Sequence, residues 1–313
     1  MARILVAEKI AEPALQRMRD AGHEVDIQVG LSPEELIEAV VGAQALIIRS
    51  ATTVTAQVIN SGKDLVLVGR AGVGLDNVDV AAATEAGVLV ANAPLSNVVS
   101  AAEQTLALIL ATARNLPQAH SALTQGRWER SAWSGVELQG KTLAIVGLGR
   151  IGRLVATRAA AFDMRLIGYD PYVTQESAAE AGVELVSLDE IAARADFLTL
   201  HVAKTPDTTN LIDAAFLAKA KATLRVINVA RGGIVNEADL AEAIASGQIA
   251  GAGIDVWETE PTTESPLFAL PSVVVAPHLG ASTAEAQDKA GDAIADQVLA
   301  ALSGKPVEFA VNA

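Results

Sequence analysis

Residues 143–152 read LAIVGLGRIG, an apolar run that passes directly into three closely spaced glycines. The run is short and rich in β-branched residues, which predicts a strand, and the residues from Ile151 onward have the pattern of a helix. In such a strand–turn–helix, Gly147 permits the tight turn, Gly149 lets a pyrophosphate approach the backbone, and Gly152 lets the helix pack on the strand. The segment therefore predicts a dinucleotide-binding domain.

An acidic residue is expected after this motif, and Asp170 ends the next strand-like run, about 20 residues further on. A carboxylate there accepts hydrogen bonds from the adenosine ribose and repels a 2′-phosphate, which favours NAD over NADP. The alternative is a glycine-rich turn followed by an ordinary surface aspartate. It is disfavoured by the strand before the motif and the helix after it. We therefore expect NAD as the cofactor.

Short apolar runs alternate with helical periods over nearly the whole chain. The strand-like runs are 3–8, 45–49, 65–71, 88–93, 143–149, 165–170, 197–202, 224–230, 253–256 and 273–277. Ser32, Ser100, Ser187 and Ser282 each precede a glutamate by three residues, which predicts capping boxes at helix starts. This alternation predicts parallel sheets with helices on both faces.

The strands form two series, and a length of 313 residues suits two domains. The helix from Ser282 to about Leu302 follows the last strand and is expected to cross back to the first domain. We predict a substrate-binding lid domain from residues 1–97 plus 284–313, and an NAD-binding Rossmann domain from residues 98–283. The predicted fold class is α/β, with two Rossmann-like or flavodoxin-like βα domains, doubly wound parallel sheets and a cleft between them.

Composition excludes several classes of function. The formal net charge is −14, which argues against a nucleic-acid groove and against binding to an anionic membrane surface. The chain has no cysteine, and its four histidines lack metal-ligand spacing, so no metal site is expected. The most apolar helix candidate, residues 105–113, is too short for a bilayer, which needs about 20 apolar residues. We therefore expect a cytoplasmic protein with no nucleic-acid or membrane partner.

Three predicted strands in the second half of the chain are followed by polar residues that suit oxidation of an alcohol. Ligands of open α/β sheets bind beyond the carboxyl ends of the strands, so these residues should converge. His278 can accept the hydroxyl proton, because imidazole titrates near neutrality. Glu260 can accept a hydrogen bond from the other ring nitrogen, and Arg231 can polarise the oxygen at C2 and hold a carboxylate.

Each of these residues also has an ordinary interpretation when taken alone. A histidine after proline is more often a loop residue, a glutamate before proline is usually on the surface, and an arginine beside two glycines can cap a turn. Together at strand ends, in a dinucleotide-binding fold, the functional interpretation is favoured. His201 ends a strand without a carboxylate nearby in sequence, and His23 and His120 are interpreted as structural or exposed.

At these residues the chain resembles the D-isomer-specific 2-hydroxyacid dehydrogenases. The resemblance rests on GLGRIG (147–152), YDP (169–171), NVARGGIVNE (228–237), GAGIDVWETEP (251–261) and APHLGAST (276–283), and it extends over essentially the whole chain. Segments of the first half, RSATT (49–53), GRAGVGLDNVD (69–79) and NAPLSN (92–97), are similar to those of the members that oxidise 3-phosphoglycerate at the start of serine synthesis.

The resemblance implies a set of site residues. The implied catalytic set is Arg231, Glu260 and His278. The implied NAD contacts are Val73, Gly147, Gly149, Arg150, Ile151, Gly152, Asp170, Val202, Val229, Ala230, Asp255 and Gly280. The implied substrate contacts are Arg49, Val73, Gly74, Asn97, Arg231 and His278. Of these, Arg49 is expected to hold the phosphate of a phosphorylated 2-hydroxy acid.

The resemblance also implies a homodimer or a dimer of dimers, formed through the nucleotide-binding domain. The loop with Trp128 and Trp133 is a candidate interface, because tryptophan is enriched at interfaces. Arg130 is hypothesised to reach the partner's active site and to offset the acidic charge of the protein. Longer members of the family continue past a point like Val307–Ala313 into domains that bind serine, so feedback by serine is not expected here.

Two alternatives remain open. One is another enzyme of the same family, such as a glyoxylate or hydroxypyruvate reductase, which would share the catalytic set and differ in the lid domain. The other is an NAD-sensing dimeric corepressor, in which intact Arg231, Glu260 and His278 would not imply turnover. The first-half segments favour the phosphorylated acid over both alternatives.

Overall fold

Two wholly parallel sheets organise residues 1–313, all of which the computed structural model describes. The chain divides into a first unit, Met1–Asn97 with Ala281–Ala313, and a second unit, Val98–Gly280. It enters the second unit after Asn97 and returns after Gly280, whereas the sequence suggested a return after residue 283. The difference arises because residues 281–283 lead into the N-cap of the last helix at Thr283 and belong with that helix.

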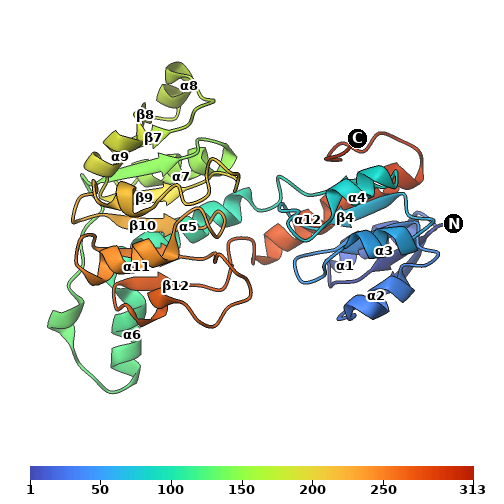
Figure 1. Cartoon of the computed structure of the whole chain (residues 1–313), viewed down its shortest axis with the longest axis horizontal. Helices are drawn as coiled ribbons and strands as arrows, with labels where there is room; N and C mark the ends of the chain where they lie inside the picture. Colours follow the sequence, from blue (N-terminus) through green and yellow to red (C-terminus); the bar gives the residue numbers. More distant parts are fainter. The chain divides into compact units, whose positions relative to one another are not determined.

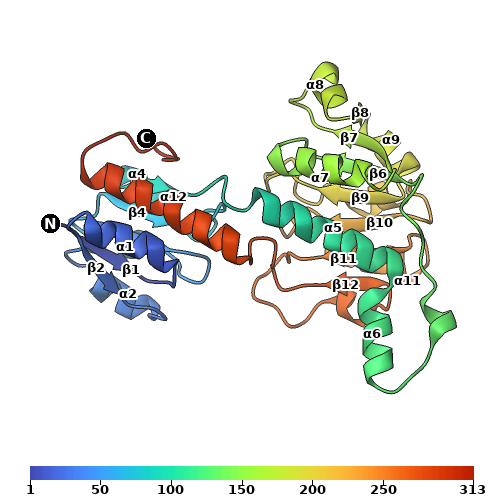
Figure 2. The same ribbon diagram turned by 180° about the vertical axis from the view of Figure 1, so that it is seen from behind.

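The first unit is a five-stranded sheet with the order β2-β1-β3-β4-β5 and helices on both faces. Its strands are β1 (Arg3–Val6), β2 (Glu24–Ile27), β3 (Ala45–Ile48), β4 (Leu67–Arg70) and β5 (Leu89–Ala91). Its helices are α1 (Glu12–Asp20), α2 (Pro33–Ala39), α3 (Ala56–Ser61), α4 (Val80–Glu85) and α12 (Ala284–Leu302). Side chains of α1 and α12 form the core on one face, and those of α2, α3 and α4 form the core on the other. Figures 1 and 2 show these two faces in turn.

The second unit is a seven-stranded sheet with the order β12-β11-β10-β9-β6-β7-β8. Its strands are β6 (Thr142–Val146), β7 (Arg165–Tyr169), β8 (Glu184–Leu185), β9 (Phe197–Leu200), β10 (Arg225–Asn228), β11 (Gly251–Ile254) and β12 (Val273–Val275). Its helices are α5 (Val98–Arg114), α6 (Leu116–Thr124), α7 (Arg150–Ala160), α8 (Gln175–Glu180), α9 (Leu188–Arg194), α10 (Ala214–Leu217) and α11 (Glu237–Ala245), with short 3₁₀ turns η1 (Arg130–Trp133) and η2 (Pro266–Ala269).

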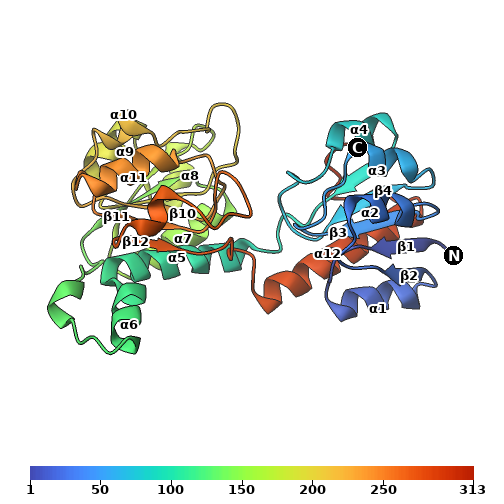
Figure 3. The same ribbon diagram turned by 60° about the horizontal axis from the view of Figure 1, so that its bottom comes forward.

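Helices cover both faces of the second sheet as well. Side chains of α5, α7 and α8 pack on one face, and those of α9, α10 and α11 pack on the other. The prediction of doubly wound α/β sheets is therefore confirmed. In Figure 3, α6 and the chain that leads to η1 extend away from the sheet and helices of the second unit.

All ten expected strands are present, and two further strands were missed. The missed β2 is an edge strand whose residues are all at least partly exposed, so it lacks an apolar run. The missed β8 has only two residues. An apolar run in the sequence indicates a buried strand. The sequence therefore did not predict β2, which is partly exposed, or β8, which is very short.

Two of the four expected capping boxes are present, at Ser32 and Ser187, where the serine and the glutamate satisfy each other's backbone N–H groups. The other two expectations were wrong. Ser100 lies inside α5, and its hydroxyl donates to the carbonyl of Gly280 at 2.7 Å. The N-cap of α12 is Thr283 rather than Ser282. No helix of the chain combines the length and the apolar character needed to cross a bilayer.

Candidate active site

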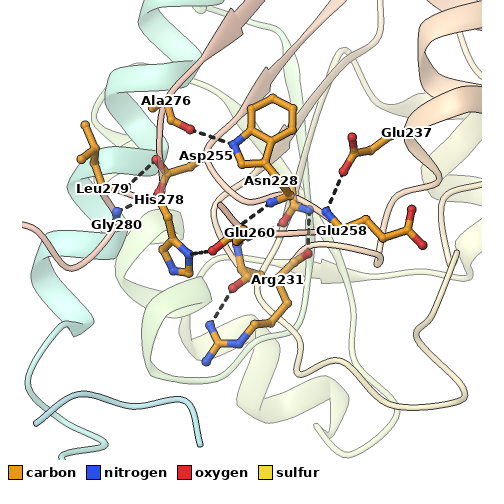
Figure 4. Close-up of polar contacts among 12 residues, drawn as sticks. Asn228, Arg231, Glu237, Asp255, Glu258, Glu260, Ala276, His278, Leu279 and Gly280 are labelled. Carbon is orange, nitrogen blue, oxygen red and sulfur yellow. Dashed lines mark hydrogen bonds and ion pairs between the residues drawn. The ribbon is translucent and has the colours of Figure 1, made fainter. Parts of the chain in front are cut away.

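Arg231, Glu260 and His278 lie in the loops that follow three neighbouring strands of the second sheet. Arg231 follows β10, Glu260 follows β11 and His278 follows β12. These strands are adjacent and parallel, so their carboxyl ends share one edge. Figure 4 shows the three side chains together at that edge.

His278 and Glu260 form a close pair. The Nδ1 atom of His278 lies 2.5 Å from Oε2 of Glu260, and the other carboxylate oxygen accepts the backbone N–H of Trp257 at 2.9 Å. Burial alone would raise the pKa of Glu260. The hydrogen bonds from His278 and Trp257 and the charges of His278 and Arg231 outweigh burial, and the pKa lies below its ordinary value. An ionised carboxylate only accepts hydrogen bonds, so Nδ1 carries the proton and Nε2 remains for another partner.

The backbone at His278 is unusual, because its φ of 56° lies in the left-handed region that few residues other than glycine adopt. Asp255 holds this turn. Its carboxylate accepts the N–H of Leu279 at 2.8 Å and of Gly280 at 2.7 Å, and its backbone carbonyl accepts the N–H of His278 at 2.7 Å. The Asp255 side chain is fully buried. Charge-assisted bonds to a buried carboxylate can stabilise a strained turn, so Asp255 fixes the direction in which the imidazole leaves the chain.

Arg231 is placed by its neighbours in the chain. The Asn228 side chain donates to the carbonyl of Arg231 at 2.9 Å and accepts the N–H of Ala230 at 3.1 Å. Nη1 of Arg231 donates to the carbonyl of Ala230 at 2.8 Å. A Cβ at Gly232 would lie 1.7 Å from the carbonyl oxygen of Trp257, so only glycine lets these two loops meet. This close approach brings Arg231 to the Glu260 loop.

The glycine-rich turn between β6 and α7 has the shape that a dinucleotide requires. Gly147 has a φ of 93°, and a Cβ there would lie 2.5 Å from the carbonyl oxygen of His201. A Cβ at Gly152 would lie 2.0 Å from the carbonyl oxygen of Gly147. Gly149, the exposed N-cap of α7, has open space where its Cβ would point and carries no side-chain cap. The start of α7 therefore offers free N–H groups beneath an open surface, which suits a pyrophosphate.

Asp170 and Arg153 hold this turn from both sides. Oδ2 of Asp170 accepts the N–H of Leu148 at 2.8 Å, while Nε of Arg153 donates to the carbonyl of Leu148 at 2.9 Å. The Leu148 side chain is buried. Arg153 was missed in the sequence, where it looks like an ordinary helix residue. Asp170 stands at the end of β7 beside the turn.

Of the other expected NAD contacts, Val73 belongs to the first unit, and those of the second unit lie near these loops. Arg150 and Ile151 open α7, and Val202 lies close to Gly147. A Cβ at Gly280 would be 3.0 Å from the Val229 side chain and 3.3 Å from Asp255. The structure thus brings Val229, Asp255 and Gly280 together, with Ala230 next in the chain.

The expected substrate contacts Arg49, Val73, Gly74 and Asn97 belong to the first unit. Arg49 follows β3, and Val73 and Gly74 follow β4. The Val73 carbonyl accepts from the Asn92 side chain at 2.6 Å. Parallel strands place these loops at the carboxyl edge of the first sheet.

His201 is a different kind of residue from His278. Burial lowers the pKa of His201 to about 3, and its Nε2 lies 3.0 Å from the Thr199 hydroxyl. It has no carboxylate partner and stays neutral. Asn228 was missed as a supporting residue. Its signal was a polar residue at the end of an otherwise apolar strand, and it is buried.

Comparison with known proteins places the chain among dehydrogenases. It is 53% identical over 311 residues to the D-3-phosphoglycerate dehydrogenase of Mycobacterium bovis, a match that covers 99% of this chain and 58% of that protein. A crystal structure from Thermus thermophilus is 35% identical, with a TM-score of 0.91 and coverage of 99% of both chains. A glyoxylate reductase from Paecilomyes thermophila is 27% identical, with a TM-score of 0.88 and coverage of 99% of this chain and 98% of that one.

A family model matches the segment that contains the glycine-rich turn and the Arg231, Glu260 and His278 loops. It is described as the NAD binding domain of D-isomer specific 2-hydroxyacid dehydrogenases, and it matches residues 106–280. The segment holds nearly the whole second unit, so NAD is the cofactor of this fold. The chain belongs to the D-isomer specific 2-hydroxyacid dehydrogenase family.

Proposed function

We propose that this chain oxidises 3-phospho-D-glycerate to 3-phosphohydroxypyruvate with NAD, the first step of L-serine biosynthesis, in the cytoplasm. The pairing of His278 with Glu260 beside Arg231 carries the proposal of dehydrogenase chemistry. The relative at 53% identity supports the choice of substrate. The chain spans 58% of the length of that relative.

We assign the proton transfer to His278. Its Nδ1–H donates to Glu260, which leaves Nε2 to accept the proton of the C2 hydroxyl. Bound NAD supplies the acceptor for the hydride that leaves C2. As the C–H and O–H bonds break and the carbonyl forms, Glu260 stabilises the imidazolium and Arg231 stabilises the negative charge on the C2 oxygen. In the reverse direction His278 returns the proton.

We assign substrate binding to Arg231, His278, Arg49, Asn97 and the backbone at Val73–Gly74. Arg49 provides the cation for the phosphate, because a guanidinium offers several donors in one plane. A few such cations must overcome the repulsion between an anionic substrate and a chain of net charge −14. We assign the NAD contacts to the glycine-rich turn of residues 147–152 and to Val73, Asp170, Val202, Val229, Ala230, Asp255 and Gly280.

Initial rates with a panel of 2-hydroxy acids, followed by NADH absorbance, test the proposal. We expect 3-phosphoglycerate to have the highest kcat/KM, above glycerate, glycolate and lactate. Arg49→Ala should raise KM for 3-phosphoglycerate at least tenfold more than KM for glycerate. Equal effects on both acids would contradict the phosphate assignment. A preference for glycolate or glycerate over 3-phosphoglycerate would indicate the reductase alternative, and tight NADH binding without turnover would indicate a corepressor-like binding protein.

We propose that the chain forms a homodimer or a dimer of dimers through α6 and the loop that follows it. This region exposes Leu116, Leu123 and Trp128 at 63%, 55% and 81%. Apolar side chains in such numbers on an extended element favour an interface. Arg130, in η1, is proposed to act at the partner's active site. Light scattering of Trp128→Ser together with Leu123→Ser should show monomers. An unchanged mass would contradict this interface.

A further inference from the structure

A glutamate outside the sites described above holds the loop that carries Arg49. Glu8 follows β1, and its Oε1 accepts three backbone N–H groups of the neighbouring loop. The donors are Arg49 at 2.8 Å, Ala51 at 3.1 Å and Thr52 at 2.8 Å. A single oxygen at the focus of three amides is the arrangement by which backbone concavities bind anions. Here the anion is the protein's own carboxylate.

Backbone carbonyl groups of the same loop are also held by hydrogen bonds. The Asn77 side-chain amide donates to the carbonyl of Arg49 at 2.7 Å and to that of Thr52 at 2.6 Å. Nη1 of Arg49 lies 3.5 Å from the carbonyl of Lys9, the residue next to Glu8. Both peptide groups that flank the loop are therefore fixed by the first unit itself, and the Arg49 side chain makes one long contact with it.

In this arrangement the backbone amides of the loop bind Glu8, and the Arg49 side chain has a different role. Because Glu8 occupies these three amides, they are not available to an anionic substrate, and the side chain of Arg49 is the cationic group that the loop offers to it. A guanidinium binds an anion best when its backbone is fixed in advance, since less conformational entropy is then lost on binding. We propose that Glu8 is a positioning residue that fixes Arg49 for binding of the substrate's phosphate, a role that rests on the proposed function for the identity of the ligand.

The main test is a pair of variants at Glu8. Glu8→Ala removes the acceptor and should raise KM for 3-phosphoglycerate about tenfold with kcat changed less than about twofold. Glu8→Gln keeps an oxygen acceptor and should restore KM to within about threefold of wild type, although it removes a negative charge near the binding site. Glu12→Ala, an exposed glutamate of the same unit paired with Arg19, is the matched control and should leave KM unchanged.

Charge and hydrogen bonding predict opposite results for the Gln variant. If Glu8 acted only through its charge, Gln and Ala would change KM equally and in the direction of tighter phosphate binding. That result would overturn the proposal, as would an unchanged KM in Glu8→Ala. A tenfold rise in Ala with rescue in Gln supports it.

Amide hydrogen exchange in the unaltered protein provides a test that needs neither variant nor substrate. The amides of Arg49, Ala51 and Thr52 should be protected, while that of Ser50 between them donates to no acceptor in the protein and should exchange fast. Equal and fast exchange at all four would overturn the proposal. If the loop is protected but 3-phosphoglycerate is not turned over, the proposed function fails while the positioning of Arg49 by Glu8 stands.

Discussion

His278 Nδ1 and Glu260 Oε2 lie 2.5 Å apart, although the two residues come from loops that follow different strands. The parallel order of β11 and β12 brings those loops together, and the buried Asp255 sets the turn from which the imidazole projects. The pair is therefore assembled by the order of the strands in the sheet.

Replacing the proposed base should abolish most of the activity without affecting the cofactor. His278→Ala is expected to lower kcat by roughly 10²–10⁴, the usual contribution of a general base. The dissociation constant for NADH, measured by fluorescence titration, should change little, because the glycine-rich turn and Asp170 are untouched. A nearly normal kcat in this variant would refute the assignment.

Removing the charge of Glu260 should change the pH dependence of the reaction. In Glu260→Gln the imidazolium form of His278 loses the carboxylate that stabilises it. The acidic limb of the kcat/KM profile should move to lower pH. Glu258→Gln is the control, since the same loop carries Glu258 exposed to solvent, with only its backbone N–H bonded, to Glu237. Identical profiles for Glu260→Gln and wild type would count against the pair.

Asp255 should matter for both stability and turnover. Asn at this position has one acceptor oxygen, so the N–H groups of Leu279 and Gly280 cannot both keep their present partners. Leaving a buried donor unpaired costs about 1–3 kcal/mol, which chemical denaturation can measure. We expect Asp255→Asn to lower kcat about tenfold through misplacement of His278, with the pH profile unchanged. Wild-type stability and kcat together would exclude the role of Asp255 in this turn.

The two glycines at the start of α7 should respond differently to alanine. Gly149→Ala places a methyl group in open space, so the melting temperature of the free protein should equal that of wild type. The dissociation constant for NAD should rise at least tenfold, because the methyl group stands where the pyrophosphate approaches the backbone. Gly152→Ala places a methyl group 2.0 Å from the carbonyl oxygen of Gly147, so it should lower the melting temperature as well. Equal melting temperatures for the two variants would show that the turn adapts.

His201 should make the second unit sensitive to acid. Its pKa in the folded protein is about 3, against 6.5 for the unburied side chain. Between these values the unfolded chain binds a proton that the folded chain does not, so stability is lost as pH falls from 6.5. The loss is at most about 1.4 kcal/mol per pH unit.

The check is urea denaturation at pH 7 and pH 5. His201→Gln should show a smaller loss of stability between the two than wild type does. The exposed His120→Gln should behave like wild type. The same loss in all three proteins would mean that His201 does not contribute.

Much of the fold was predictable because its signals are local. Buried strands such as β3 and β6 read as apolar runs, and the glycines of the turn at 147–152 are required by contacts within one strand–turn–helix. The meeting of Arg231, Glu260 and His278 was predictable for another reason. In a parallel sheet, residues that follow adjacent strands must share an edge.

Features that depend on distant contacts could not be predicted. Nothing in the sequence near His278 indicates a left-handed backbone, because the group that holds it is Asp255, at the end of another strand. Glu8 looks like any polar residue after a strand, and its three bonds connect it to a loop some 40 positions away. Edge strand β2 escaped because its partly exposed residues show no apolar run.

The first unit is assembled from both ends of the chain, since Ile294 and Val298 of α12 complete the core that α1 begins. During synthesis on a ribosome, the first 97 residues therefore emerge with one face of their sheet covered by α1 alone. The continuous segment Val98–Gly280 can fold before α12 is available to complete the first unit. The first unit becomes complete only after α12 has been synthesised, so the second unit is expected to fold first and the first unit last.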